Sequence, residues 1–129
     1  MLVVLDTNIL VSAILTPAGK PGWLVNQVVM GNFKLCYDYR ILEEYRDVLL
    51  RPKFHVTEAY LDFLLDNLTY DGVSVVPPSI NEPFIDEDDK KFYEVAKFCN
   101  APLITGNLRH YPKDSLVKSV SDFCSSFLM

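Results

Sequence analysis

Carboxylates are the side chains of this sequence best suited to chemistry, and they fall in three groups. The first is Asp6, which directly follows the apolar run Leu2 to Leu5, a pattern typical of a strand buried on both faces. A carboxylate at the C-terminal end of such a strand lies where open α/β sheets place their ligands. Taken alone, Asp6 is compatible with nucleotide, phosphoryl or metal chemistry, and other acids at the same edge would favour a divalent metal.

The second group lies in a predicted helix over residues 39–50. At about 100° per residue, Ile41 and Tyr45 belong to the apolar face of this helix. Glu43 points nearly opposite that face, whereas Glu44 falls at its edge. An acid beside a buried stripe needs a partner, because an unpaired buried carboxylate is costly. Glu44 is therefore the better functional candidate, and a salt bridge with a neighbouring Arg or Lys is the alternative explanation.

The third group opens a predicted helix over residues 88–99. Asp86 and Asp89 have the i, i+3 relation of a helix cap and a first-turn acid, both favoured by the helix dipole. Capping does not explain why Asp89 lies three residues before Phe92, turned toward the buried face. Asp88 shares much of that orientation, and helix geometry alone does not choose between the two acids.

A polar strand end completes the set. The predicted strand 102–105 ends in Thr105, Gly106 and Asn107, which places Thr105 and Asn107 on the same carboxyl edge as Asp6. A glycine-containing turn is the simpler explanation of this segment, because such turns are common. Taken together, the three acidic positions and this strand end indicate side chains that converge on one edge of a sheet.

The elements that must position these side chains alternate along the chain. Strands are predicted at 2–5, 33–37, 73–76, 102–105 and 116–120, and helices at 7–14, 21–31, 39–50, 57–70 and 88–99, with a further helix at the C-terminus. Such alternation predicts a parallel sheet with helices on both sides. We expect an α/β fold in three layers, with four to five parallel strands, in a single domain over residues 1–129.

Composition restricts the classes of function. Half of the 129 residues are hydrophobic and 22% are charged, as in ordinary globular proteins. No apolar run approaches the roughly 20 residues that a membrane span needs, and Asp6 interrupts the only stretch resembling a signal peptide. The odd count of three cysteines favours a reducing cytosol, so we expect a cytoplasmic protein. The net charge of −5 provides no global field that attracts nucleic acid.

The order and spacing of these motifs resemble the PIN domain (PilT N-terminus) family of metal-dependent ribonucleases, which includes the VapC-type toxins of toxin–antitoxin pairs. The resemblance covers nearly the whole chain and rests on VLDTNILVSAIL at 4–15, ILEEYRDVLLRPKF at 41–54, DEDDKKFYEVAKFCNAPLITGN at 86–107 and SVSDF at 119–123. The Leu-rich second segment and the TGN ending are most similar to the toxin subgroup. The resemblance implies a Rossmann-like sheet with Asp6 on its central strand.

Position by position, the acids of the family match residues of this chain. The resemblance makes Asp6, Glu44 and Asp89 the catalytic acids and metal ligands. The third acid is Asp89 because the family places an alanine seven residues later, here Ala96. Asp86 matches an additional acid three residues before the third, as a metal ligand or as a residue behind the ligands.

Asn107 departs from the family pattern, because it stands where the family has a fourth acid. Asn offers a carbonyl oxygen or binds a water but brings no negative charge. We therefore expect a second metal site to be weaker than in relatives with four acids. The resemblance implies that Asn107, Thr105 and Ser12 position water or ligands.

The reaction implied by the resemblance is hydrolysis of RNA phosphodiester bonds with Mg²⁺ or Mn²⁺. One metal would generate the attacking hydroxide, and a second, if bound, would stabilise the leaving oxygen. Arg46, Arg109 and His110 are candidates for phosphate contacts, because they are near the acids in sequence. The implied partners are an RNA substrate, an antitoxin protein and, since homodimers are common in the family, a second copy of the chain.

The sequence also bears on two other functions. A catalytically weak PIN-like module that binds an antitoxin or RNA would fit Asn107 and the estimated pI of 4.9. An aspartyl phosphatase resembling the haloacid dehalogenase family would carry a second Asp two residues after its nucleophile. Asn8 occupies that position here, which argues against the phosphatase.

Overall fold

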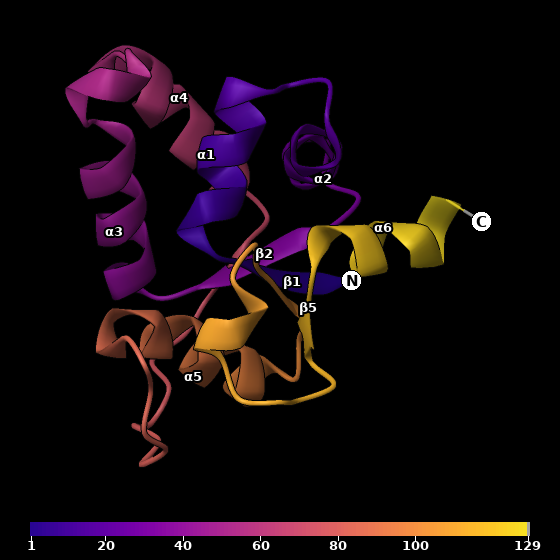
Figure 1. The fold of residues 1–129 in the computed structure, drawn as a ribbon. Coiled ribbons are helices and arrows are strands. Elements are labelled where there is room, and N and C mark those ends of the chain that lie inside the picture. Colours follow the sequence, from indigo (N-terminus) through magenta and orange to yellow (C-terminus); the bar gives the residue numbers. More distant parts are fainter. Residues whose placement is uncertain (129) are drawn as a thin grey trace.

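A central parallel sheet organises the molecule, whose computed structural model describes residues 1–128 (Figure 1). Its strands are β1 (Leu2–Leu5), β2 (Lys34–Tyr37), β3 (Val73–Ser74), β4 (Leu103–Ile104) and β5 (Val117–Lys118). The strand order is β3-β2-β1-β4-β5, and all neighbouring pairs run parallel. The central strand is therefore β1, and the prediction of an α/β fold with four to five parallel strands is confirmed.

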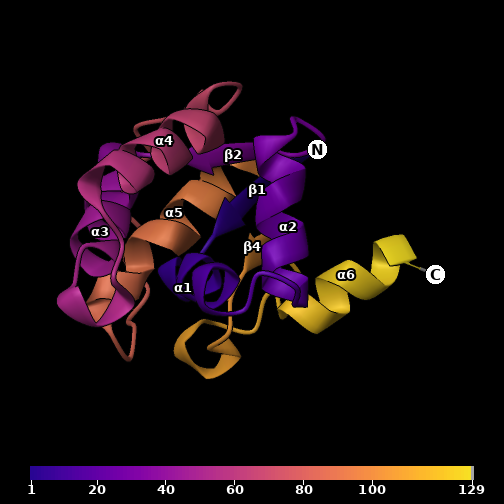
Figure 2. The same cartoon turned by 90° about the horizontal axis from the view of Figure 1, so that it is seen from above.

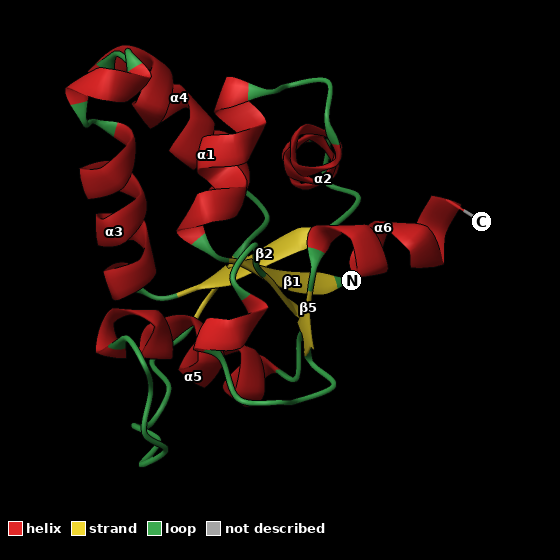
Figure 3. Ribbon diagram, viewed as in Figure 1, coloured by secondary structure: helices red, strands yellow, loops and turns green. Residues whose placement is uncertain are grey.

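Helices flank the sheet on both faces. The α-helices within residues 1–128 are α1 (Thr7–Leu15), α2 (Lys20–Val29), α3 (Tyr39–Leu49), α4 (Glu58–Thr69), α5 (Lys90–Cys99) and α6 (Val120–Leu128). Short 3-10 helices lie in the connections: η1 (Pro52–Phe54) between α3 and α4, η2 (Glu87–Asp89) directly before α5, and η3 (Leu108–His110) between β4 and β5. In Figure 1, α1, α2 and α4 lie above the sheet and α5 lies below it. Figure 2 shows the same layers from above, and Figure 3 distinguishes the helices from the strands.

The side chains of β1 occupy the middle of the core. Val3, Val4 and Leu5 are fully buried, which explains why this strand has no polar residue between its ends. On the α5 side of the sheet, the fully buried Phe92 lies near Tyr45 of α3, with ring centroids 6.4 Å apart. Burial on both faces holds β1 in place, and β1 in turn positions the residue that follows it.

Several elements are shorter than the sequence predicted. The strand expected at 73–76 ends at Ser74, because Pro77 and Pro78 have no N–H with which to continue the ladder. One further hydrogen bond follows the strand, since the Val75 amide donates to the Tyr37 carbonyl at 2.9 Å. The strands expected at 102–105 and 116–120 likewise shorten to two residues each.

The helix expected at 88–99 begins instead at Lys90. The residues before it form η2, because the Asp86 side chain accepts a hydrogen bond from the Asp88 amide and holds a tighter turn there. The acidic run therefore lies in a separate turn ahead of α5, which changes the directions in which its side chains point.

Helix length also bears on membrane insertion. Within residues 1–128, every helix is too short or too polar to span a bilayer.

Candidate functional site

Asp6 lies at the carboxyl end of β1, where the polypeptide enters α1. Its amide donates to the Ile104 carbonyl at 3.0 Å, so Asp6 still pairs with the neighbouring strand. The hydroxyl of the buried Tyr45 donates to the Leu5 carbonyl at 2.5 Å. Only 5% of Asp6 is exposed. These contacts hold the carboxylate at the sheet edge that the sequence predicted.

Two hydroxyl groups bind the same oxygen of Asp6. Thr105 Oγ1 donates to Asp6 Oδ2 at 2.8 Å, and the Tyr111 hydroxyl donates to it at 2.9 Å. Burial raises the pKa of Asp6 above its ordinary value, because desolvation disfavours the charged form. The two hydroxyl hydrogen bonds lower this pKa, and the negative charge of Glu44 raises it. Asp6 is thus a firmly oriented carboxylate in surroundings that favour a nearby cation.

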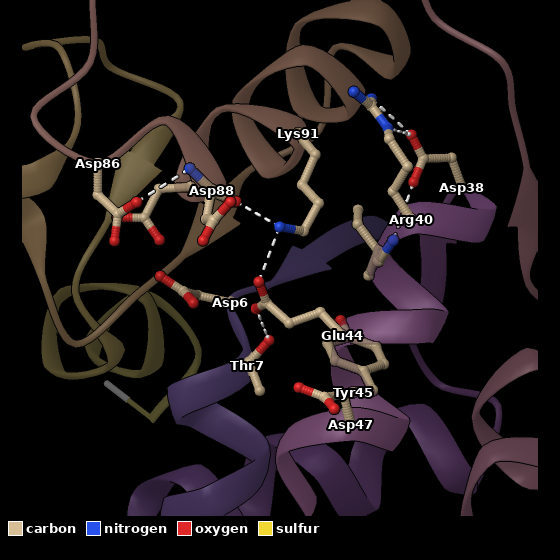
Figure 4. A network of polar contacts seen from close by, with 12 residues as sticks. Asp6, Thr7, Asp38, Arg40, Glu44, Tyr45, Asp47, Asp86, Asp88 and Lys91 are labelled. Carbon is tan, nitrogen blue, oxygen red and sulfur yellow. Dashed lines mark hydrogen bonds and ion pairs between the residues drawn. The ribbon is translucent and has the colours of Figure 1, made fainter.

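Glu44 reaches the same edge from α3 and is bound by two other elements. Thr7 Oγ1, at the start of α1, donates to Glu44 Oε2, and Lys91 Nζ of α5 lies 2.7 Å from Glu44 Oε1 (Figure 4). The salt bridge with a neighbouring Lys that the sequence left open is therefore present. Glu43 is exposed, as its position opposite the apolar face predicted.

Asp89 is the acid of the third group that is partly buried toward Asp6. Its side chain is 17% exposed, and its Oδ2 lies 3.0 Å from His110 Nδ1. Burial raises the pKa of Asp89, the charges of Asp6 and Asp86 raise it further, and contact with His110 opposes the shift. The Asp6 carboxylate is thus near enough to Asp89 for its charge to raise the pKa of Asp89.

The structure separates the roles of the remaining acids in this run. Asp86 caps η2, and its negative charge raises the pKa of Asp89. Asp88 is exposed, and its backbone carbonyl accepts a hydrogen bond from Lys91. Of the two acids between which helix geometry did not choose, Asp89 is the one that is partly buried, and the charge of Asp6 raises its pKa.

The three supporting polar residues are placed differently from one another. Thr105 is fully buried and binds Asp6 directly. Asn107 is exposed, and its amide donates to Thr105 Oγ1 at 2.9 Å, so its backbone supports the residue that orients Asp6. Ser12 is exposed on α1, on the turn after the one that begins beside Asp6.

Of the three basic candidates, His110 alone contacts an acid of the site. Arg46 pairs with Asp62 of α4 at 2.6 Å, and both side chains are about half exposed. His110 contacts Asp89, and Arg109 is exposed beside it on η3. Of these residues, only Arg109 and His110 stand at the rim of the site.

Three side chains that sequence reasoning did not assign to the site contribute to it. Tyr111 binds Asp6, Thr7 binds Glu44, and Lys91 binds Glu44. Thr7 directly follows Asp6 in the sequence, but a threonine at the start of a helix is equally typical of an ordinary helix cap. Lys91 follows Lys90 in a short basic pair, a pattern typical of a solvated surface, yet its side chain is only 12% exposed.

A second polar network anchors the elements around the site. Arg40 Nη2 lies 2.6 Å from Asp38 Oδ2, and Arg40 Nη1 lies 2.9 Å from Glu94 Oε1. Asp38 also caps α3 through the Ile41 amide, and Glu94 accepts a hydrogen bond from the Ile80 amide at 2.8 Å. Asp38 and Glu94 are both buried. This Arg40 network joins α3, α5 and the segment before η2.

The donor chemistry of the edge fits Mg²⁺ or Mn²⁺ through a pair of carboxylates. Among residues 1–128, no three His, Cys, Asp or Glu side chains are gathered closely enough to hold a metal ion together. Mg²⁺ commonly keeps several waters and is bound by one or two carboxylates. Asp6 and Asp89 suit that mode, whereas Glu44 is already engaged by Lys91.

Comparison with known proteins agrees with the geometry. A family model described as the PIN domain matches residues 2–109. An uncharacterized protein of Methanocaldococcus jannaschii is 34% identical over 108 residues, an alignment that covers 81% of this chain and 70% of the relative. The comparison with solved structures found no significant match. PIN domains are typically nucleases that use divalent metals. This chain belongs to the PIN domain family.

Proposed function

We propose that the protein is a metal-dependent endoribonuclease that hydrolyses RNA phosphodiester bonds at the carboxyl edge of β1. The observation that carries the proposal is the buried Asp6 carboxylate, held by two hydroxyls beside Glu44 and Asp89. Burial and neighbouring negative charge both disfavour an ionised carboxylate, so this arrangement calls for a cation. Perturbed acids gathered at the ligand-binding edge of an α/β sheet are typical of a functional site.

In this proposal Asp6 and Asp89 hold Mg²⁺ or Mn²⁺. Asp86 and Glu44 do not bind the ion directly and add negative charge around it. A bound metal of this kind supplies a hydroxide nucleophile near neutral pH and neutralises phosphate charge. Burial raises the pKa of Tyr111 well above its ordinary value, so its hydroxyl stays protonated and donates to Asp6. His110 contacts Asp89 through its ring Nδ1 and so helps to orient this second carboxylate.

RNA would approach across η3, because Arg109 and His110 lie at the rim of the site there. With a net charge of −5, attraction of the substrate depends on such local groups and on the cation. Arg46 is paired with Asp62 on α3 and α4 and is the weaker candidate for a phosphate contact.

We further propose that this nuclease acts as the toxin of a toxin–antitoxin pair. It rests on the similarity of the segment 41–54 and of the TGN ending to the toxin subgroup. An antitoxin would copurify with the chain when the gene immediately upstream is coexpressed, and it would suppress RNA cleavage. Size-exclusion chromatography with light scattering tests the proposed homodimer.

The substitution Asp6→Asn tests the enzymatic proposal. It keeps the shape of the side chain but removes the charge, so we expect Mn²⁺-dependent RNA cleavage to fall to background while circular dichroism shows the native fold. Asp62→Asn is the matched control, because Asp62 is an exposed acid on α4 whose partner is Arg46. Undiminished cleavage by folded Asp6→Asn protein would contradict the proposed mechanism.

A catalytically weak module that binds RNA or an antitoxin is the second candidate. It is favoured by Asn107 at the fourth acidic position and by the scarcity of preassembled ligands in residues 1–128. Calorimetric titration with Mn²⁺ separates the two functions. Binding only at millimolar or higher Mn²⁺ would favour the non-enzymatic module, and tighter binding would favour the nuclease.

A further inference from the structure

We propose that the Lys91 ammonium is a permanent positive charge of the carboxylate site, which takes the place of a second divalent cation beside Glu44. The protein then binds a single metal ion. This inference rests on the proposed metal-dependent function and specifies how many ions that function uses.

The contacts of Lys91 are those of a cation built into the site. Its Nζ lies 2.7 Å from Glu44 Oε1 and donates to the backbone carbonyl of Asp88. The side chain is 12% exposed and crosses the ring of Phe92, 5.3 Å from the ring centroid. Lysine ammonium groups are rarely this buried unless they are paired. Figure 4 shows Lys91 extending from α5 toward Glu44 on α3.

Glu44 has both of its oxygens engaged in this arrangement. Thr7 donates to Oε2 and Lys91 binds Oε1. The ammonium makes Glu44 a poorer ligand for a further cation, because Lys91 already compensates the carboxylate charge and repels a second cation beside it. Glu44 therefore contributes negative charge to the edge while Lys91 compensates it locally.

The charges around the site support one ion rather than two. In two-metal sites the ions lie about 3.5–4 Å apart, so a fixed ammonium in the second position repels an incoming divalent cation strongly at such a distance. The fourth acid that would offset this repulsion is replaced by the neutral Asn107. Asp6 and Asp89 remain as the pair for the single ion.

Lys90 provides a matched control on the same helix. It is also partly buried, at 20% exposure, but its nearest acid is Glu87 at 3.9 Å rather than Glu44. A substitution at position 90 thus removes one lysine charge from the start of α5 without touching the Glu44 pair.

The test is calorimetric titration of the metal-free protein with Mn²⁺, with bound ions counted independently by manganese electron paramagnetic resonance. We expect native protein, Lys90→Met and the charge-conserving Lys91→Arg each to bind one ion. We expect Lys91→Met and Lys91→Gln to bind a second ion. The dissociation constant of this second ion should be at least tenfold lower than that of any second, weaker ion on the native protein. Two neutral variants guard against a folding defect in either one, which circular dichroism would reveal.

The outcomes distinguish a failure of this inference from a failure of the proposed function. Two ions bound by the native protein, or one ion bound by both folded neutral variants, would overturn the role of Lys91 and leave the nuclease proposal standing. Binding by the neutral variants alone would contradict the single ion of the native protein and, with it, metal use by the native protein. No binding by any form would overturn both.

Discussion

Asp6 depends on two hydroxyl groups that come from the far end of the chain. Tyr111 and Thr105 bind the same oxygen, so the orientation of the carboxylate is determined by residues about a hundred positions away. Partners that orient a metal ligand commonly change metal affinity by about 10–100-fold when they are removed. Substitution of single residues around Asp6 therefore tests the site directly.

Tyr111→Phe removes one of these hydrogen bonds while keeping the ring that packs against Phe84. We expect Mn²⁺ affinity to fall by about tenfold, and the free energy of unfolding to fall by only about 1 kcal/mol. Calorimetry and urea denaturation measure the two quantities. Tyr93→Phe is the control, because its hydroxyl binds Asp114 instead. Equal Mn²⁺ affinity in Tyr111→Phe and native protein would show that Tyr111 does not position Asp6.

The neighbouring acids Asp88 and Asp89 form a second matched pair. Asp89 is partly buried and contacts His110, whereas Asp88 is exposed and binds Lys91 only through its backbone. We expect Asp89→Asn to abolish Mn²⁺-dependent cleavage and Asp88→Asn to retain more than half of the native rate. The measurement is the rate of RNA cleavage by both variants at saturating Mn²⁺. A larger loss of rate in Asp88→Asn than in Asp89→Asn would show that Asp88 is the third acid of the site.

At the scale of elements, the Arg40 network joins α3 to α5. Arg40→Ala would leave Asp38 and Glu94 buried without a cation, so we expect the free energy of unfolding to fall by about 3 kcal/mol. Arg46→Ala removes an exposed pair and should cost about 0–1 kcal/mol. Urea denaturation of both variants is the measurement, and equal losses would argue against a structural role for the network.

The loop before β5 is tied to α5 through Asp114. The Leu116 amide and Lys97, with a smaller contribution from Tyr93, lower the pKa of Asp114 to about 2. Because the folded pKa lies below the unfolded value of about 3.9, this stabilisation is present above pH 4 and is lost as the pH falls through about 2. The carboxylate is then protonated in both states.

We therefore expect Asp114→Asn to lower the free energy of unfolding by about 1–2 kcal/mol at pH 7, with a difference that shrinks toward pH 2. Denaturation with urea at several pH values measures this dependence. A difference that stayed constant from pH 7 to pH 2 would show that the charge of Asp114 does not stabilise the loop.

At the scale of the whole molecule, the sequence predicted the parallel sheet and the edge that carries Asp6. The unbroken apolar run of β1 and the helical spacing around Phe92 are local signals, and they are reliable because burial requires them. Local patterns do not reveal which side chains meet across elements. The contacts of Tyr111 with Asp6 and of Lys91 with Glu44 depend on how η3, α3 and α5 pack, so they emerge only from the fold.

RNA cleavage by native protein and by Asp6→Asn, each with Mn²⁺ and with excess chelator, tests the central claim most directly. We expect cleavage by native protein with Mn²⁺, no cleavage after chelation, recovery when Mn²⁺ is restored, and no cleavage by Asp6→Asn under any condition. Cleavage that persisted in chelator, or in folded Asp6→Asn protein, would contradict a metal-dependent nuclease site at the end of β1.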